Sequence, residues 1–190
     1  MSKQTEPWYS NRVHRRITMS RWGEVGTPVL IFPTAAGDAE ETERFHLISV
    51  LSPLLDACRI KAYSLDSVAG QAWVTEDNSI KNAAQVQEQF DQMIVHEIVP
   101  AIHHDCGYPG ELDIYLAGAS IGAFNALSTL CKHPDIFKKA ICMSGTYDVR
   151  KFMTGPEPDQ RACQSPPQFL PHIPEGPEHL RLLRARFVLL

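Results

Sequence analysis

The 190-residue sequence contains no apolar run that approaches the roughly 20 residues needed to cross a bilayer as a helix. Residues 1–10 are polar and lack the apolar segment of a secretory signal. No run of lysine and arginine is present, and the formal net charge is −4, which argues against a nucleic-acid-binding surface. We therefore expect a cytoplasmic protein that binds neither nucleic acid nor a membrane.

The sequence also lacks the cysteine and histidine spacings that form disulfide frameworks or metal sites. Its five cysteines are odd in number, widely spaced and without a C-x-x-C pair, which indicates a reducing compartment. The eight histidines show no metal-ligand spacing either, since the adjacent His103 and His104 point in different directions at a predicted helix end. We expect no metal and no cofactor.

The sequence does contain short apolar runs separated by helical patterns, which is typical of an α/β fold around a mostly parallel sheet. Its length predicts a single domain over residues 1–190. Buried strands are predicted at 29–32, 60–65, 112–117, 140–143 and 187–190, and an exposed antiparallel edge strand at 12–21.

Three helices are predicted between these strands. The first covers 41–56 and is expected to break at Pro53, and the third covers 121–132. The second covers 82–104 and carries an apolar stripe of Val86, Phe90, Ile94 and Ile98. Seven of the 14 prolines follow residue 150, and residues 154–177 predict an irregular, lid-like segment.

The motif that carries chemistry is GASIG at 118–122, a G-x-S-x-G with Ser120 at its centre. It follows a predicted strand and opens a predicted helix, the setting that a nucleophile elbow requires. A sharp turn there would raise the Ser120 hydroxyl above the sheet edge, and the flanking glycines would let the chain pack tightly. The helix N-terminus would add partial positive charge beside a developing oxyanion. A glycine-rich turn without chemistry is the alternative.

A second element is the small-residue loop at 33–38, which follows the predicted strand 29–32. In α/β-hydrolases the loop after this strand supplies one backbone N–H of the oxyanion hole, and the residue after the nucleophile supplies the other. The candidates are the N–H groups of Ala35 and Ile121, with the neighbouring Ala36 as the alternative to Ala35. Small side chains suit a plain turn equally well.

Five segments, in this order, carry a family resemblance: LIFPT at 30–34, LDSV at 65–68 with Trp73, GASIGA at 118–123, HPDIF at 133–137 and SGTYD at 144–148. They resemble the bacterial putative-esterase family of the α/β-hydrolase superfamily, related to esterase D-type and polyhydroxybutyrate depolymerase-like enzymes. The resemblance covers about residues 22–171 and implies an α/β-hydrolase-type three-layer sandwich. It also implies a serine esterase that acts on a small-molecule ester through an acyl-enzyme, with a triad in the order Ser, Asp, His.

The sequence departs from that family toward its end. The family places the acid after the strand that follows the one near Met143, and the histidine after the last strand. The corresponding strand here is 187–190, and the sequence stops before either residue. We therefore expect a C-terminally truncated chain with an incomplete sheet and weak or no activity. Asp148 is a candidate acid, although a turn or capping role is favoured for it.

Histidines elsewhere in the sequence offer little as a replacement base. His172 and His179 lie in or beside the lid-like segment and could reach Ser120 only by an unusual route, and His133 is expected to cap a helix end. A non-catalytic α/β-hydrolase-like binding protein and an acyltransferase of the same fold therefore remain alternatives to the esterase. The apolar strand 187–190 predicts self-association through an exposed sheet edge.

Overall fold

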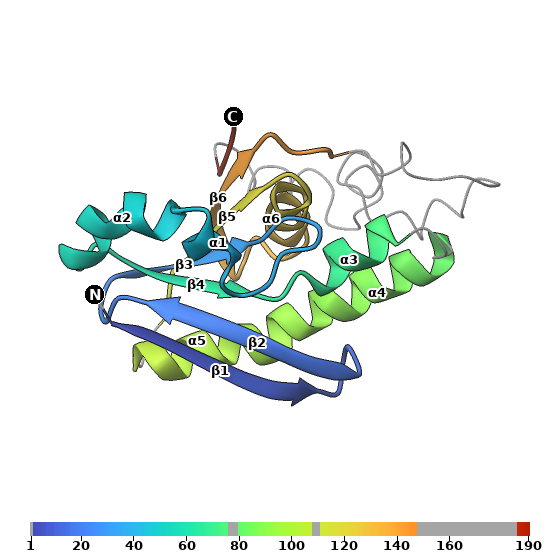
Figure 1. Ribbon diagram of the computed structural model, residues 1–190, viewed down its shortest axis with the longest axis horizontal. Coiled ribbons are helices and arrows are strands. Elements are labelled where there is room, and N and C mark those ends of the chain that lie inside the picture. The colour runs from blue at the N-terminus through green and yellow to red at the C-terminus, as the bar shows by residue number, and fades with distance from the viewer. Residues whose placement is uncertain (1, 76–79, 108–110, 148–185) are drawn as a thin grey trace.

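The computed structural model describes residues 2–75, 80–107, 111–147 and 186–190. Its centre is a seven-stranded sheet with the strand order β1-β2-β4-β3-β5-β6-β7 (Figure 1). The strands are β1 (Lys3–Ser10), β2 (Arg15–Trp22), β3 (Thr27–Phe32), β4 (Ile60–Leu65), β5 (Ile114–Ala119), β6 (Phe137–Met143) and β7 (Phe187–Leu189). Five neighbouring strands are mutually parallel, namely β4, β3, β5, β6 and β7, which confirms the predicted α/β architecture. The predicted lid-like segment 154–177 lies outside the described residues.

The N-terminal part of the sheet differs from the prediction. The predicted edge strand at 12–21 corresponds to β2, which lies inside the sheet between β1 and β4 and pairs antiparallel with both. The edge position belongs to β1, a strand that the sequence analysis missed because its residues are polar and mostly exposed. Ile17 and Met19 of β2 are buried, so the charged residues around them mark a half-buried strand rather than an edge.

Helices cover both faces of the sheet, as the predicted three-layer sandwich requires. The helical elements are α1 (Glu41–Arg44), α2 (Leu47–Asp56), α3 (Val68–Val74), α4 (Ile80–Met93), the π-helical segment η1 (Ile94–Ile98), α5 (Val99–Cys106) and α6 (Ile121–Lys132). The largest core lies on one face, where α4, η1, α5 and α6 pack against the sheet, and includes Phe90, Ile98 and Leu130. On the other face α2 packs Ile48 and Leu55 against the sheet in a smaller core.

The predicted helix at 41–56 is two helices, and the break does not occur at Pro53. The chain turns at His46, whose φ of 64° ends α1 and starts α2. Phe45, which lies directly before this turn, is 72% exposed. Pro53 lies inside α2 on its exposed side. The carbonyl of Ser49, which Pro53 cannot bond, belongs to an exposed residue that water can reach.

The predicted helix at 82–104 is a continuous helical stretch with a wider turn in its middle. The stripe is confirmed, since Phe90, Ile94 and Ile98 are buried and Val86 is half-buried. A spacing of four residues exceeds the 3.6 residues of an α-helical turn, so such a stripe drifts around an α-helix. The π-helical turn η1 compensates for this drift and keeps the stripe on the sheet. In the described part of the chain, no helix is long and apolar enough to cross a membrane.

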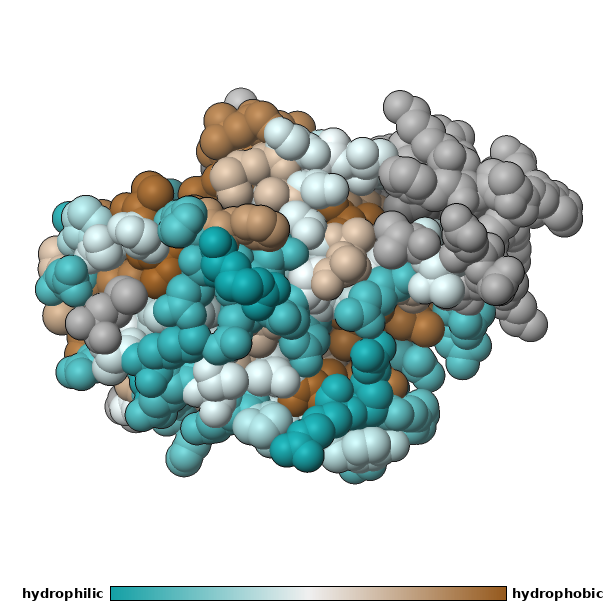
Figure 2. All heavy atoms as spheres, viewed as in Figure 1, coloured by the Kyte–Doolittle hydropathy of each residue, from teal (hydrophilic) through white to brown (hydrophobic). Residues whose placement is uncertain are grey.

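The sheet face that α2 covers continues over β6 and β7, where none of the described helices packs on it. Ala117 of the α2-side core aligns with Ile141 of β6, which in turn aligns with Val188 of β7, so the three share one face. Ile141 is 46% exposed and Val188 is 52% exposed. Figure 2 shows hydrophobic side chains gathered at the top of the molecule, where Figure 1 places these two strands.

Candidate active site

The G-x-S-x-G motif forms the connection between β5 and α6. The strand extends two residues further than predicted, to Ala119, because Gly118 still pairs with Phe32 of β3 and Cys142 of β6. Ser120 then adopts φ 57° and ψ −123° and becomes the N-cap of α6. This region of backbone space belongs to the first corner of a type II′ turn and is dominated by glycine. A hydrogen bond from the Ser120 N–H to the Met143 carbonyl (3.0 Å) fixes the turn, and Ser120 is exposed.

The two glycines of the motif are required by the close approach of α6 to the strands. A Cβ at Gly118 would lie 2.3 Å from the backbone of Gly122, and a Cβ at Gly122 would lie 2.2 Å from the Phe32 carbonyl oxygen. Side chains cannot occupy either position without moving backbone. The sequence pattern therefore encodes a tight strand-to-helix turn, with the central serine raised at the carboxyl edge of the sheet.

The start of α6 presents backbone N–H groups at this turn. The first bonds to the Ser120 carbonyl come from Ala123 (3.1 Å) and Phe124 (3.3 Å). The Ile121 N–H precedes them and is one of the donors that a helix leaves without an intrahelical acceptor. Because α6 has 12 residues, its N-terminus also contributes partial positive charge beside Ser120.

The loop after β3 lies against the start of α6. The Gly37 N–H donates to the Thr34 carbonyl (3.1 Å), which places Ala35 and Ala36 at the corners of a turn. A Cβ added to Gly70 of α3 would meet the Ile121 side chain at 3.0 Å and the Ala35 Cα at 3.1 Å. The structure thus brings together the two predicted oxyanion residues, Ala35 and Ile121, beside the Ser120 turn.

The model of the family described as "Putative esterase" matches residues 81–175, half of the chain. The chain belongs to this esterase family. A comparison with curated proteins finds no match.

Several solved structures share the fold of this esterase-family chain. A ferulic acid esterase aligns with a TM-score of 0.67 at 16% identity, over 96% of this chain and 75% of that one. An S-formylglutathione hydrolase from Agrobacterium tumefaciens aligns with a TM-score of 0.65 at 11% identity, over 99% and 85%. The substrate-bound fluorophosphonate-binding serine hydrolase F of Staphylococcus aureus aligns with 0.60 at 14% identity, over 96% and 72%. The fold of the chain is therefore that of the α/β-hydrolase esterases.

Beside the Ser120 turn, two buried side-chain amides form hydrogen bonds that the sequence patterns did not predict. Trp73 packs with Ala35, Ile121 and Phe124. Its indole N–H donates to Gln87 Oε1 (3.0 Å), and Gln87 Nε2 donates to Asn125 Oδ1 (3.1 Å). Gln87 and Asn125 are buried. The sequence did contain a signal for this pair, because Gln87 and Asn125 are polar residues on the core-facing sides of two predicted helices.

A base and an acid for Ser120 are not found among the described residues. Asp148 lies outside them, and so do His172 and His179. His133 ends α6 and its Nε2 lies 2.9 Å from Asp91 Oδ2, in agreement with its expected structural role. No described side chain hydrogen-bonds to Ser120 Oγ, and the described residues hold no group of three or more His, Cys, Asp or Glu side chains that could bind a metal.

Proposed function

We propose that this chain is a serine esterase that hydrolyses a small-molecule carboxylic ester through an acyl-enzyme on Ser120. Membership of the esterase family supports ester hydrolysis in general. The observation that supports the serine mechanism is the backbone of Ser120, held at φ 57° at a strand-to-helix turn beside Ala35 and Ile121. A strained conformation of this kind is common where a fold presents a reactive side chain.

The proposed reaction has two steps. Ser120 Oγ attacks the ester carbonyl carbon and its proton passes to a base, while the carbonyl oxygen becomes an oxyanion that accepts hydrogen bonds from the Ala35 and Ile121 N–H groups. The tetrahedral species then expels the alcohol, which takes up the proton, and leaves the acyl group on Ser120. Water attacks this ester in the same way, releases the acid and restores the serine hydroxyl.

We expect slow turnover from the 190-residue chain, because the described residues provide no base in hydrogen-bond contact with Ser120. General acid–base catalysis contributes roughly 10²- to 10⁴-fold. When the triad of a serine hydrolase is removed, its serine included, an acceleration of about 10³- to 10⁴-fold over water remains from the oxyanion hole and substrate binding. The activity of the chain is therefore expected to be measurable, with one part that depends on Ser120 and a remainder that depends only on Ala35, Ile121 and substrate binding.

The test is hydrolysis of p-nitrophenyl acetate by the wild-type chain and by Ser120→Ala. Ser49→Ala, on the exposed side of α2, is the matched control. We expect Ser120→Ala, but not the control, to lower the rate and to abolish formation of the acyl-enzyme. A rate for Ser120→Ala equal to that of the wild-type chain would contradict the proposal.

Three further variants locate the base and acid. Should the wild-type chain turn over fast instead, loss of that turnover in His172→Ala or His179→Ala would identify the base, and Asp148→Asn would test the acid in the same way. Binding of the ester without turnover by the wild-type chain would favour the non-catalytic binding protein. Preferential acyl transfer to an added alcohol would favour the acyltransferase.

A further inference from the structure

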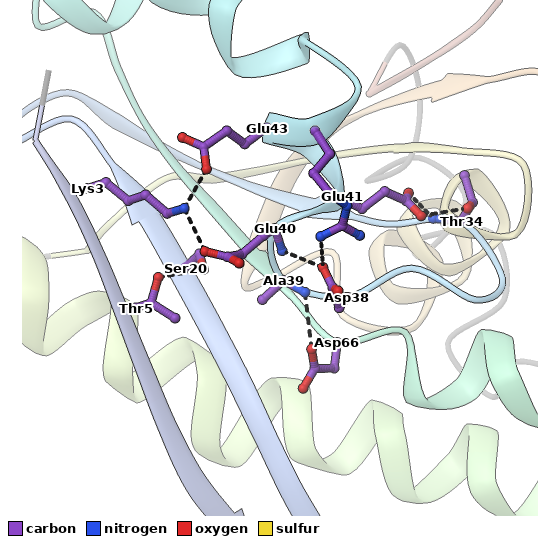
Figure 3. A network of polar contacts seen from close by, with 11 residues as sticks. Lys3, Thr5, Ser20, Thr34, Asp38, Ala39, Glu40, Glu41, Glu43 and Asp66 are labelled. Atoms are coloured by element: carbon purple, nitrogen blue, oxygen red, sulfur yellow. Dashed lines mark hydrogen bonds and ion pairs between the residues drawn. The ribbon is translucent and has the colours of Figure 1, made fainter.

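The loop that carries Ala35 is held by a buried carboxylate, that of Glu41 in α1 (Figure 3). Glu41 Oε1 accepts the Thr34 N–H at 2.7 Å, and Glu41 Oε2 accepts the Thr34 hydroxyl at 2.8 Å. Glu41 is only 6% exposed, and within the described residues no lysine, arginine or histidine lies within ion-pair distance of it. The nearby guanidinium of Arg44 acts on Glu41 from farther away, because it pairs with Asp38. Burial of an acidic side chain is costly, so its hydrogen bonds to Thr34 help to offset that cost.

The surrounding loop is shaped to admit this carboxylate. A Cβ at Gly37 would lie 2.2 Å from Glu41 Oε2, so a side chain there would displace it. From the other direction Asp66 Oδ1 accepts the Ala39 N–H (3.1 Å), and the Ser67 N–H donates to the Gly37 carbonyl (3.1 Å). The loop is thus fixed at Thr34, Gly37 and Ala39.

The neighbouring acids in the same segment behave differently. Glu40 and Glu43 bind Lys3 of β1 at the surface, with side chains 46% and 41% exposed (Figure 3). Exposed ion pairs of this kind contribute little to stability. Of these three acids, Glu41 alone contacts the turn of the candidate oxyanion site.

The hydrogen bonds of Thr34 fix the direction of the next N–H group. The Glu41 carboxylate accepts hydrogen bonds from the Thr34 N–H and hydroxyl, and the Thr34 carbonyl accepts one from the Gly37 N–H. The Thr34 carbonyl and the Ala35 N–H belong to one planar trans peptide and point in opposite directions. Since the carbonyl points into the turn, the Ala35 N–H points out of it, and among the described residues no group accepts a hydrogen bond from it.

We infer that Glu41 is a positioning residue of the esterase site, which orients the Ala35 N–H toward the oxyanion by binding Thr34. This inference rests on the proposed function. Oxyanion donors stabilise a transition state because they are held in place before the reaction. A displacement of about 1 Å at such a site can cost about 10²-fold in rate.

The test compares Glu41→Met, which removes both acceptors at similar volume, with Glu41→Gln, whose amide oxygen can still accept the Thr34 N–H. Glu40→Met is the matched control. We expect Glu41→Met to lower kcat for p-nitrophenyl acetate at least tenfold with KM within twofold, and Glu41→Gln to restore most of the loss. A kcat for Glu41→Met within twofold of the control, a loss confined to KM, or equal impairment of both variants would overturn the inference.

Two more measurements separate this inference from folding and from the proposed function. If Glu41→Met does not fold, Thr34→Val removes one of the two hydrogen bonds and is expected to lower kcat by a smaller factor, whereas an unchanged kcat would overturn the inference. Ser120→Ala in parallel tests the esterase proposal alone.

Should that proposal fail, amide hydrogen exchange decides the positioning role. We expect the Thr34 amide of Glu41→Gln to keep the wild-type protection and that of Glu41→Met to exchange at least tenfold faster; equal protection in both would overturn the role.

Discussion

Replacement of Ser120 by glycine should stabilise the protein relative to replacement by alanine. Both variants remove the hydroxyl, and they differ in whether a Cβ remains at φ 57° and ψ −123°. L-residues with a Cβ avoid this conformation, whereas glycine adopts it freely. The comparison therefore isolates the backbone strain stored at the elbow.

The expected difference follows from two opposing contributions. A non-glycine residue held in a sparsely populated backbone region costs about 1–3 kcal/mol. Glycine in place of alanine lowers the free energy of unfolding by about 0.4–1 kcal/mol, because it increases the conformational entropy of the unfolded chain. Ser120→Gly should thus exceed Ser120→Ala in free energy of unfolding by about 1.3 kcal/mol at the middle of both ranges, and by at most about 2.6 kcal/mol. In a chain of this size each kcal/mol corresponds to about 2–4 °C in Tm.

Urea unfolding and thermal unfolding, both followed by circular dichroism, measure this difference. Ser49 provides a control of opposite sign, because it lies in the helix α2, where Ser49→Gly should be about 1 kcal/mol less stable than Ser49→Ala. A Ser120→Gly variant that is less stable than Ser120→Ala would refute the strained-elbow interpretation.

Three further predictions concern other parts of the fold. Burial raises the pKa of Asp105, but hydrogen bonds from Lys61 and Tyr63 and the charge of Lys61 outweigh this effect, so the pKa lies below its usual value. Asp105→Asn should therefore lower the free energy of unfolding by about 3 kcal/mol near pH 7. Because the wild-type chain loses this contribution when Asp105 is protonated, urea titrations below about pH 4 should show a smaller further loss of stability in Asp105→Asn than in the wild type. Gln87→Leu removes the hydrogen-bond partner of the buried Asn125 amide oxygen and of the half-buried Trp73 N–H, and it should lower the free energy of unfolding by about 2 kcal/mol. An unchanged urea midpoint would contradict a stabilising role for these two hydrogen bonds. Val188→Lys, on the uncovered sheet face, should reduce self-association in light scattering; a wild-type chain that stays monomeric at all concentrations would contradict this prediction.

The parts of the fold that sequence patterns predicted are those where local chemistry and burial agree. The strand 60–65 and the helix 121–132 are observed with the predicted bounds, because a mostly apolar run that ends at Asp66 specifies the strand and a glycine-flanked start specifies the helix. The β5–α6 turn at Ser120 was predictable for the same reason, because its two glycines lie too close to neighbouring backbone to carry a side chain.

The missed features depend on partners that are distant in sequence. β1 is polar and becomes a strand only by pairing with β2, so its own pattern does not reveal it. The helix break at His46 depends on a left-handed backbone conformation that no glycine marks. Glu41 reads as an ordinary acid at a helix start, and only the folded loop shows that its carboxylate is buried on Thr34.

The most direct test of the central claim is labelling with a fluorophosphonate followed by mass spectrometry of the intact chain and its peptides. The probe phosphonylates a serine whose hydroxyl is positioned for nucleophilic attack beside oxyanion donors. We predict one adduct per chain, located on Ser120, formed slowly and absent from Ser120→Ala. A folded wild-type chain that remains unlabelled, or that carries the adduct at another residue while Ser120 is unmodified, would contradict the account.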